Sequence, residues 1–181
     1  VAAIGLRGIG VLMNWRGTVH PFMRKPSWLS IAALPWDQQF ARLSDPSFRA
    51  QLIGEGSVPP ESPDMAAFFM LVTAAWAMQY PLTEGFTYEP AREDSVFGYA
   101  HRTGQDAASV DPAAWAYDWM MQDGGSGFLY LPVINYMDGN LDFTRGLLDA
   151  NDTLVSLSDG GAHCGTICDA AAPTFLLSYW A

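Results

Sequence analysis

A strand-like apolar run that ends in an acid and two glycines constrains the C-terminal part of this chain. Thr153–Ser158 is apolar and rich in β-branched residues, which is typical of a short strand buried on both faces. Asp159 follows, then Gly160 and Gly161, with His163 four residues after the aspartate. Enzymes with parallel barrels carry their chemistry at such strand ends, and glycines let a ligand approach the backbone. An ordinary turn, with Asp159 capping a helix, fits the same pattern.

Three apolar runs predict strands, and the last two enclose a short helix. The strands are Gly8–Asn14, Phe128–Asn135 and Thr153–Ser158, and the helix is Asn140–Leu148. A strand, a helix and a strand within about 30 residues predict a βαβ unit with parallel strands and a right-handed crossover. Pro132 lies inside the second strand and removes one donor from its hydrogen-bond ladder.

Polar residues follow these strands where a site is expected. Parallel strands of one unit end at the same edge, so we expect Asn135 and Tyr136 to lie near Asp159. Asn14 and Trp15 lie at the end of the first strand and are candidate pocket residues if that strand belongs to a barrel. The residues predicted to bind substrate therefore include Asn14, Asn135 and Tyr136.

Start and stop signals predict helices between the first two strands. Asp45 is a candidate N-cap followed by Pro46, and Asp111 precedes Pro112 in the same way. The predicted helices are Trp36–Leu43, a helix from Pro46 that ends before Gly54, Asp64–Gln79 and Ala113–Met121.

The predicted helix Asp64–Gln79 differs from the others in being apolar nearly all round. This pattern is typical of a helix buried between layers or against another subunit of a homo-oligomer. Plain core packing and a lid over a substrate pocket are both compatible with it.

Composition indicates a globular chain and excludes two classes of partner. Hydrophobic residues make up 50% of the 181 and charged residues 15%, the opposite of a disordered composition. The formal net charge of −10 disfavours nucleic acid and anionic membranes as partners. The longest apolar stretch, Met65–Met78, is shorter than the roughly 20 residues that span a bilayer. Two cysteines are too few for a disulfide framework and indicate a reducing, cytoplasmic compartment.

Both ends of the chain are unusually apolar. The first residues after Val1 are hydrophobic, and a helix-like pattern reaches Trp180. Termini of complete proteins are usually polar and frayed. We therefore expect these residues to be part of a longer protein, and no signal peptide is visible in them.

Asp159 is the residue best suited to carry chemistry. A carboxylate at the mouth of a barrel can ligate a metal and exchange a proton with the metal-bound water, whose pKa falls to about 7. A catalytic zinc takes about three protein ligands, so one aspartate is not sufficient. His163 with Cys164 and Cys168 offers a zinc cluster as one alternative, and cysteines packed as small buried residues are the other. His20 is expected to be a loop histidine paired with backbone or, alternatively, a metal ligand.

Several separate stretches resemble one enzyme family. Leu157–Asp169 and the following Pro173–Leu177 are similar to the last barrel strand, and the loop after it, of the N-acyl-D-amino-acid deacylase (D-aminoacylase-like) branch of the amidohydrolase superfamily. The resemblance is specific around residues 157–177 and loose between about 24 and 125. Further similarity covers Phe128–Tyr130, Asp138–Asp142, Gly10–Leu12 and Thr18–Phe22.

The resemblance implies a metal-dependent (β/α)8 TIM barrel that hydrolyses an acyl amide. Residues 1–181 would then be the C-terminal part of this α/β fold, with the last three strands and a mostly helical insertion at about 24–125. Asp159 matches the family's last-strand aspartate, which implies a metal ligand and general acid/base. His163 matches a histidine beside the substrate or the metal. The implied cofactor is one or two zinc ions held mostly by ligands upstream of Val1, and the implied substrate is a small N-acyl amine or N-acyl amino acid.

Departures from the family leave other functions open. Residues 160–181 contain no Arg or Lys, whereas deacylases acting on D-amino acids carry an arginine after this motif to hold the substrate carboxylate. The family's early His-x-His pair and its mid-barrel Cys or Lys and His ligands have no counterpart in these 181 residues. The alternatives are a cyclic-amide hydrolase or deaminase of the same superfamily, and a metal-free barrel protein that binds without catalysis.

Overall fold

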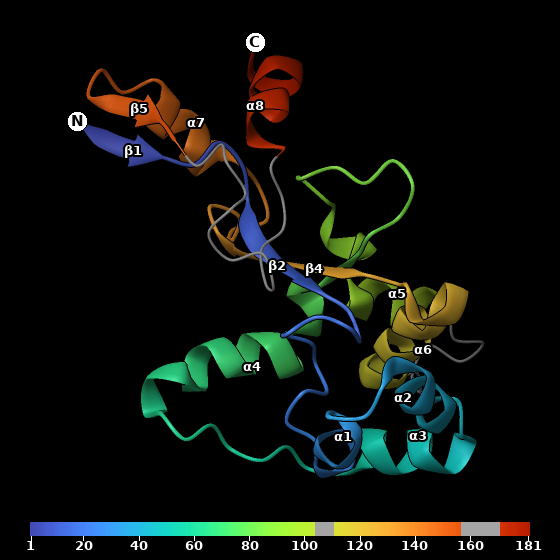
Figure 1. Cartoon of the computed structure of the whole chain (residues 1–181). Helices are drawn as coiled ribbons and strands as arrows, with labels where there is room; N and C mark the ends of the chain where they lie inside the picture. The colour runs from blue at the N-terminus through green and yellow to red at the C-terminus, as the bar shows by residue number, and fades with distance from the viewer. Residues whose placement is uncertain (104–110, 157–170) are drawn as a thin grey trace.

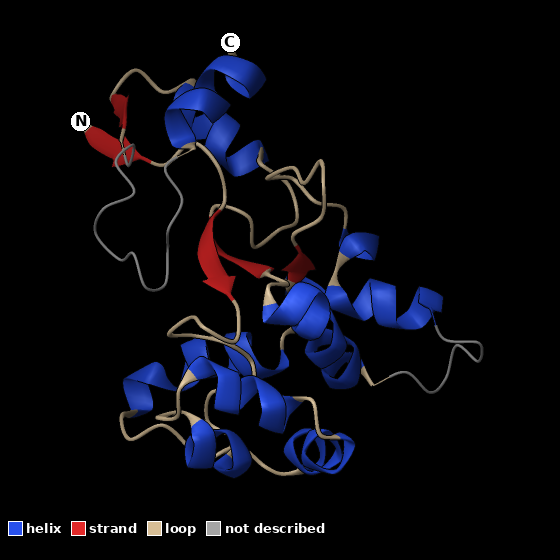
Figure 2. Cartoon of the chain, turned by 45° about the vertical axis from the view of Figure 1, so that its right-hand side comes forward, coloured by secondary structure: helices blue, strands red, loops and turns tan. Residues whose placement is uncertain are grey.

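The computed structural model describes residues 1–103, 111–156 and 171–181, and it shows a chain of mixed helix and strand. Both chain termini lie at one end of the molecule, and the first three helices lie at the other (Figure 1). The strands of the central sheet lie between these two ends (Figure 2). Within the described ranges, the strands do not close into a barrel.

The helices and strands are short, and they alternate irregularly along the chain. Short 3-10 turns cover Pro63–Met65, Trp76–Met78 and Arg92–Asp94, and a π-helical turn at Leu176–Trp180 continues the last helix. The strands are β1 (Ala2–Ile4), β2 (Ile9–Met13), β3 (Tyr80–Pro81), β4 (Leu129–Ile134) and β5 (Thr153–Val155). The helices are α1 (Pro26–Ile31), α2 (Trp36–Leu43), α3 (Pro46–Gly54), α4 (Ala66–Ala74), α5 (Val96–Thr103), α6 (Pro112–Gly125), α7 (Asp142–Leu148) and α8 (Ala172–Phe175).

A three-stranded antiparallel sheet forms the centre of the molecule, in the order β2-β4-β3. Met13 of β2 lies opposite Leu129 of β4, and Tyr80 of β3 lies opposite Tyr130. The predicted strands at Gly8–Asn14 and Phe128–Asn135 are therefore confirmed as strands. Their antiparallel pairing is not the parallel pairing that a TIM barrel requires.

An irregularity in the β2–β4 ladder lies beside Gly10. The register shifts between Ile9 and Gly10, and Gly10 lies opposite Pro132, which has no N–H to donate. The hydroxyl of Tyr130 instead donates to the carbonyl of Gly8 at 2.7 Å, so a side chain fastens the two strands where the ladder is interrupted. A Cβ at position 10 would lie 2.6 Å from a ring carbon of Tyr130, so glycine is required there.

β1 and β5 form a separate parallel pair, with Ala2 opposite Thr153 and Ile4 opposite Val155. The predicted strand Thr153–Ser158 is thus confirmed for Thr153–Val155, but its expected burial on both faces is wrong, because Leu154 and Val155 are exposed. In addition, β4 and β5 belong to different sheets. The predicted βαβ unit does not form, because β2 and β3 occupy both edges of β4 and leave none for β5. Helix α7 connects the two sheets, and the described residues contain no parallel arc of a partial (β/α)8 barrel.

The central sheet separates two apolar clusters, because side chains alternate between its faces. In β2, Val11 and Met13 belong to a helical core, and Leu12 between them packs on a second cluster. In β4, Leu131 and Tyr130 divide in the same way. Helices α1, α2, α3 and α6 contribute to the helical core, whereas the second cluster includes residues of β3 and α8.

Five rings form the centre of the helical core and are called the aromatic core below. Trp15 stacks on Phe22 with a centroid separation of 5.2 Å and meets the edge of Tyr117 at 5.0 Å. Trp28 and the imidazole of His20 complete the group, and each of the five is at most 7% exposed. Aromatic pairs in such geometry contribute beyond their buried area, so this group holds the loop after β2 against α1 and α6.

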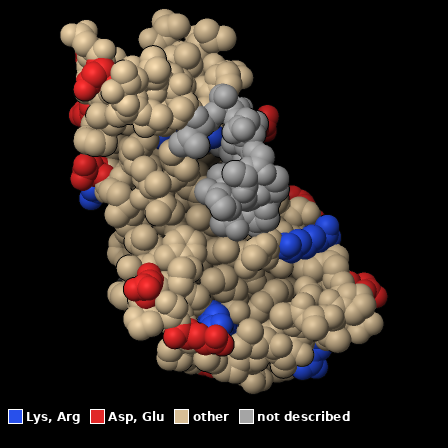
Figure 3. All heavy atoms as spheres, turned by 60° about the vertical axis from the view of Figure 1, so that its left-hand side comes forward, with Lys and Arg blue, Asp and Glu red and all other residues tan. Residues whose placement is uncertain are grey.

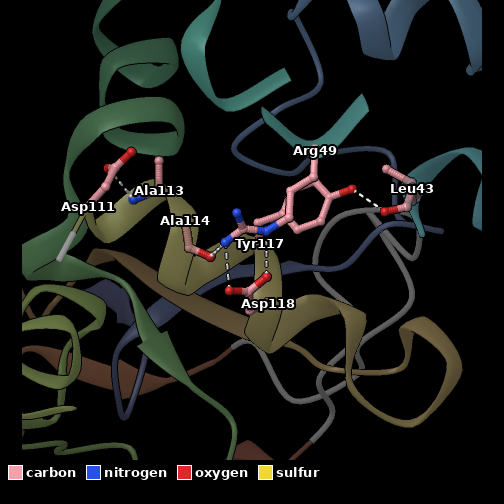
Figure 4. A network of polar contacts seen from close by, with 7 residues as sticks. All are labelled: Leu43, Arg49, Asp111, Ala113, Ala114, Tyr117 and Asp118. Carbon is pink, nitrogen blue, oxygen red and sulfur yellow. Dashed lines mark hydrogen bonds and ion pairs between the residues drawn. The ribbon is translucent and has the colours of Figure 1, made fainter. Parts of the chain in front are cut away.

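Polar contacts attach α6 to the first helices (Figure 4). The buried hydroxyl of Tyr117 donates to the carbonyl of Leu43 at 2.6 Å. Arg49 of α3 forms a two-pronged ion pair with Asp118, with distances of 2.8 and 2.7 Å. Asp111 accepts from the amide of Ala113, which confirms it as the N-cap of α6. Residues far apart in the sequence thereby form one helical layer.

The local helix signals correctly predict the bounds of α2 and the capped N-termini of α3 and α6. Helix α2 covers the predicted Trp36–Leu43, and Asp45 caps α3 by accepting from the amide of Ser47 at 2.8 Å. Trp115 and Trp119 stack face to face on α6, as their spacing predicts, with centroids 5.5 Å apart. Helices α1 and α5 are not among the predicted helices.

The predicted helix Asp64–Gln79 is shorter and less buried than expected. Helix α4 covers only Ala66–Ala74, with 3-10 turns on either side. Val72 is its one buried residue, whereas Met70 is 69% exposed. The expectation of plain core packing is therefore wrong for most of this helix in the described structure. A uniformly apolar sequence favours burial, but only one side of α4 meets the helical core.

Charged side chains are scattered over the surface in spite of the net charge of −10. Figure 3 shows a face on which single Lys, Arg, Asp and Glu side chains are separated by wide uncharged areas. None of the helices in the described ranges has the length and apolar character needed to cross a bilayer.

Candidate functional site

The two residues predicted to lie nearest the chemistry, Asp159 and His163, fall outside the described residues, as do Cys164 and Cys168. Among the residues that the structure does describe, no group of three or more His, Cys, Asp or Glu is placed to hold a metal ion. A catalytic zinc needs about three protein ligands. The described side chains therefore do not supply a zinc site.

Asn14 is buried, and its side chain bonds to backbone groups of the protein. Its side-chain amide donates to the carbonyls of Gly125 and Gly127 at 3.1 and 2.8 Å, and its oxygen accepts from the amide of Arg16 at 2.9 Å. These bonds tie the end of β2 to the end of α6. Because β2 and β4 are antiparallel, Asn14 lies at the opposite end of the strand pair from Asn135.

Asn135 and Tyr136 lie together where β4 ends. Asn135 has a φ of +66°, and its amide donates to the carbonyl of Gly5 at 3.1 Å, so it links β4 to the turn after β1. The hydroxyl of Tyr136 donates to the carbonyl of Pro90 at 2.7 Å, and its ring lines a cavity. Of the predicted site residues that the structure describes, Tyr136 is the one that faces a cavity of ligand size.

This cavity encloses about 290 Å³ beyond the end of β4 and is called the Arg92 cavity below. Its polar lining comes from Tyr80 of β3, Arg92 and Ser95, and its apolar lining includes Met78 and Phe97. The lining residues come from the 3-10 turn before β3, from β3, from the segment leading into α5 and its first turn, and from β4 and the turn after it. A volume near 300 Å³ is at the small end of the range for small-molecule sites.

Two buried phenols with raised pKa values stand at this cavity. Burial is the main cause for both Tyr80 and Tyr136. The guanidinium of Arg92 opposes the increase in each, and the Asp94 carboxylate adds to it at Tyr80. Both hydroxyls therefore stay protonated at neutral pH. Because the hydroxyl of Tyr136 is used by Pro90, Tyr80 is the phenol able to donate to a ligand.

His20 lies in the aromatic core, away from the Arg92 cavity lining. Its Nδ1 accepts from the amide of Phe22 at 3.3 Å, so the expected pairing of His20 with backbone is confirmed. Its Nε2 and the Nε1 of Trp15 are buried without a hydrogen-bond partner in the described chain. Trp28 meets the imidazole edge-on at a centroid separation of 4.4 Å. Burial lowers the pKa of His20 to about 3, which keeps the ring neutral.

Tyr80, Arg92 and Ser95 are not among the site residues that the sequence predicts. One signal was present: Ser95 precedes the apolar residues of α5 and is a typical N-cap. The closeness of the three side chains depends on β3 pairing with β4, which no local pattern indicates.

Comparison with known proteins identifies no relative of this chain. No protein-family model matches the chain, and neither the curated proteins nor the solved structures give a significant match.

Proposed function

We propose that this chain is part of a metal-dependent hydrolase that cleaves the carbon–nitrogen bond of an N-acyl amine or N-acyl amino acid. The observation that carries the proposal is the motif Leu157–Asp169 with the following Pro173–Leu177, which resembles the last strand and loop of the deacylase branch of the amidohydrolases. Asp159 is the proposed general acid/base, and His163 is proposed to contact the substrate.

The chemistry assigned to Asp159 is proton transfer. Its carboxylate would accept a proton from the attacking water and then donate a proton to the leaving amine nitrogen. A bound zinc would lower the pKa of that water to about 7. The other zinc ligands would have to come from sequence outside residues 1–181, because the described residues do not supply them.

A barrel fold would require a particular direction and pairing of the strands. In a TIM barrel, the strands at β2, β4 and β5 would run parallel in one sheet. In the described structure, β2 and β4 are antiparallel and β5 pairs with β1. The proposal therefore requires these segments to pair differently in the complete protein, and a crystal structure of that protein would decide the point.

The function is tested with the complete natural protein loaded with zinc. N-acetyl amino acids are the substrates, and release of the free amine is measured. Asp159→Asn should lower kcat by about 10²- to 10⁴-fold, which is the usual contribution of a general acid/base. Asp37→Asn is the matched control, because Asp37 is an exposed aspartate on α2, and it should leave kcat unchanged.

Two outcomes would reject this function. Equal kcat for wild type and Asp159→Asn would remove the role of the carboxylate. Hydrolysis of ring amides with no activity on N-acetyl amino acids would instead assign the chain to the cyclic-amide alternative.

A further inference from the structure

The Arg92 cavity differs in charge from the rest of the chain. The sequence has 19 acidic and 9 basic residues, yet the residues that line this cavity in the described chain include one arginine and no acid. An apolar cavity of this size with a few polar groups is the usual form of a small-molecule site. The sign of its single charge favours an anion.

The guanidinium of Arg92 has unused hydrogen-bonding capacity. One of its nitrogens donates to the backbone carbonyl of Asp138 at 3.3 Å, and no ion pair of Arg92 is found in the described chain. The neighbouring Asp94 pairs instead with Arg102 at 3.1 Å. A guanidinium has five N–H donors, arranged to hold a carboxylate with two parallel bonds. Arg92 therefore keeps donors for a ligand.

Two buried hydroxyls add to the donors of the cavity. Tyr80 is 3% exposed, and no partner for its hydroxyl is found among the described residues; its raised pKa keeps it protonated. Ser95 is 1% exposed, and its oxygen accepts from the amide of Gly98 at 3.1 Å, so its own proton remains to be donated. Both residues line the same cavity as Arg92.

The first turn of α5 also favours an anion in the Arg92 cavity. Ser95 precedes this helix and Phe97 lies in its first turn, and both line the cavity. The partial positive charge at a helix N-terminus favours an anion there. This contribution is small beside that of Arg92, and it has the same sign.

The remaining walls are apolar and define the rest of the ligand. Met78, Phe97, Pro132 and Met137 line the cavity, and none of them can hydrogen-bond strongly to a ligand. A fully hydrated anion such as inorganic phosphate would lose water against these walls without compensation. A carboxylate that carries a short apolar or aromatic group satisfies both parts of the cavity.

We propose that the Arg92 cavity binds a small organic carboxylate, with its carboxylate on Arg92, Tyr80 and Ser95 and its apolar group against Phe97, Met78 and Met137. The inference stands without the proposed hydrolase activity, because Arg92, Tyr80 and Ser95 are not among the residues assigned to that reaction. Tyr136, which the sequence analysis selected as a substrate-binding residue, forms part of the wall.

Calorimetric titration of the full chain with phenylacetate tests this site. Saturable one-to-one binding is expected, and Arg92→Gln should weaken it by about 10- to 100-fold, the usual effect of removing a hydrogen bond to a charged group. Arg42→Gln is the matched control, because Arg42 is also exposed but lies on α2 over Phe48. It should bind phenylacetate as the wild type does.

A second variant and two other probes separate the ligand chemistries. Met137→Glu places a carboxylate at a 51% exposed position of the wall, where it should not disturb folding and should abolish phenylacetate binding. Phenylacetamide, which has the same shape without the charge, should bind at least tenfold more weakly. Inorganic phosphate should not compete.

Several results would overturn the proposal. The first two are absence of saturable phenylacetate binding and an affinity of Arg92→Gln for phenylacetate equal to that of the wild type. The other two are equal affinity of the wild type for phenylacetamide and phenylacetate, and displacement of phenylacetate by an equal concentration of inorganic phosphate. Far-ultraviolet circular dichroism of each variant, compared with the wild type, shows that a loss of binding is not a loss of fold.

Discussion

The aromatic core and the β1–β5 pair are both rich in apolar residues, but they differ in how far those residues are covered. Trp15 and Phe22 are each 1% exposed in the aromatic core. Leu154 and Val155 of β5 are 65% and 44% exposed. Parallel strands are ordinarily covered on both faces, whereas the described chain leaves these two side chains largely open.

The difference shows that apolar sequence does not by itself decide burial. Trp15 is enclosed because the chain returns to it from several directions, through the loop after β2, α1 and α6. β5 contacts mainly β1 and α7. The aromatic core is therefore enclosed by several parts of the chain, whereas the β1–β5 pair depends on few contacts. The following experiments test that contrast.

Truncation of a core ring should have the largest effect. Trp15→Ala should lower the free energy of unfolding by about 3–5 kcal/mol, the usual cost of removing a buried large aromatic side chain. Leu154→Ala at the β1–β5 pair should change it by less than about 0.5 kcal/mol, as surface substitutions usually do. Urea unfolding followed by circular dichroism measures both values. Similar losses for the two variants would refute the contrast.

Acid should weaken the aromatic core through His20. The unfolded histidine takes up a proton below its ordinary pKa of 6.5, whereas the folded one stays neutral until about pH 3. Unfolding therefore takes up a proton between these values, and stability decreases as the pH falls through this window. The slope approaches about 1.4 kcal/mol per pH unit.

His20→Gln should remove this slope, at a cost in stability at neutral pH. The control is His101→Gln, since His101 is exposed on α5. Urea unfolding at pH 7.0, 6.0 and 5.0 compares the three proteins. The prediction fails if wild type and His20→Gln lose stability in parallel over this range.

Removal of one buried hydroxyl should have a smaller effect. Tyr117→Phe deletes the 2.6 Å hydrogen bond to Leu43 and should cost about 1 kcal/mol in the free energy of unfolding. Tyr179→Phe, at the 41% exposed Tyr179 near the C-terminus, should cost less. Thermal unfolding of both variants gives the order, and a larger loss for Tyr179→Phe would reverse the contrast.

The ion pair on the outside of the helical layer should contribute least. Arg49 and Asp118 have side chains that are 35% and 62% exposed. Arg49→Gln should cost about 0.2–1 kcal/mol at low ionic strength, and less in 1 M NaCl because salt screens exposed charges. Urea unfolding at the two salt concentrations measures the change. A loss that does not vary with salt would show that Arg49 acts through packing on Tyr117 instead.

Local signals in the sequence predict elements well and their pairing poorly. The caps at Asp45 and Asp111 are set by side chains that bond to nearby amides, so a few residues carry the whole signal. The direction of β4 relative to β2 depends on the path of more than a hundred intervening residues. An apolar run in the sequence does not indicate whether its strand pairs parallel or antiparallel. The connection through α7 therefore suggested a parallel unit that the sheets do not contain.

The candidate site shows the same limit. Tyr136 was found because it follows a predicted strand. Tyr80, Arg92 and Ser95 were not found, because they come together only through pairing of β3 with β4 and the position of α5. Asp159 and His163 were selected from a motif, and their placement lies outside the described residues.

Gly10 of β2 is a position that should tolerate almost no substitution. Any substitution of this glycine adds at least a Cβ, and that carbon would lie within 3 Å of the ring of Tyr130 and the carbonyl of Leu131. The phenol would have to swing away and release Gly8. A library of random variants should therefore retain glycine at this position more strictly than it retains the half-buried Ile9 beside it.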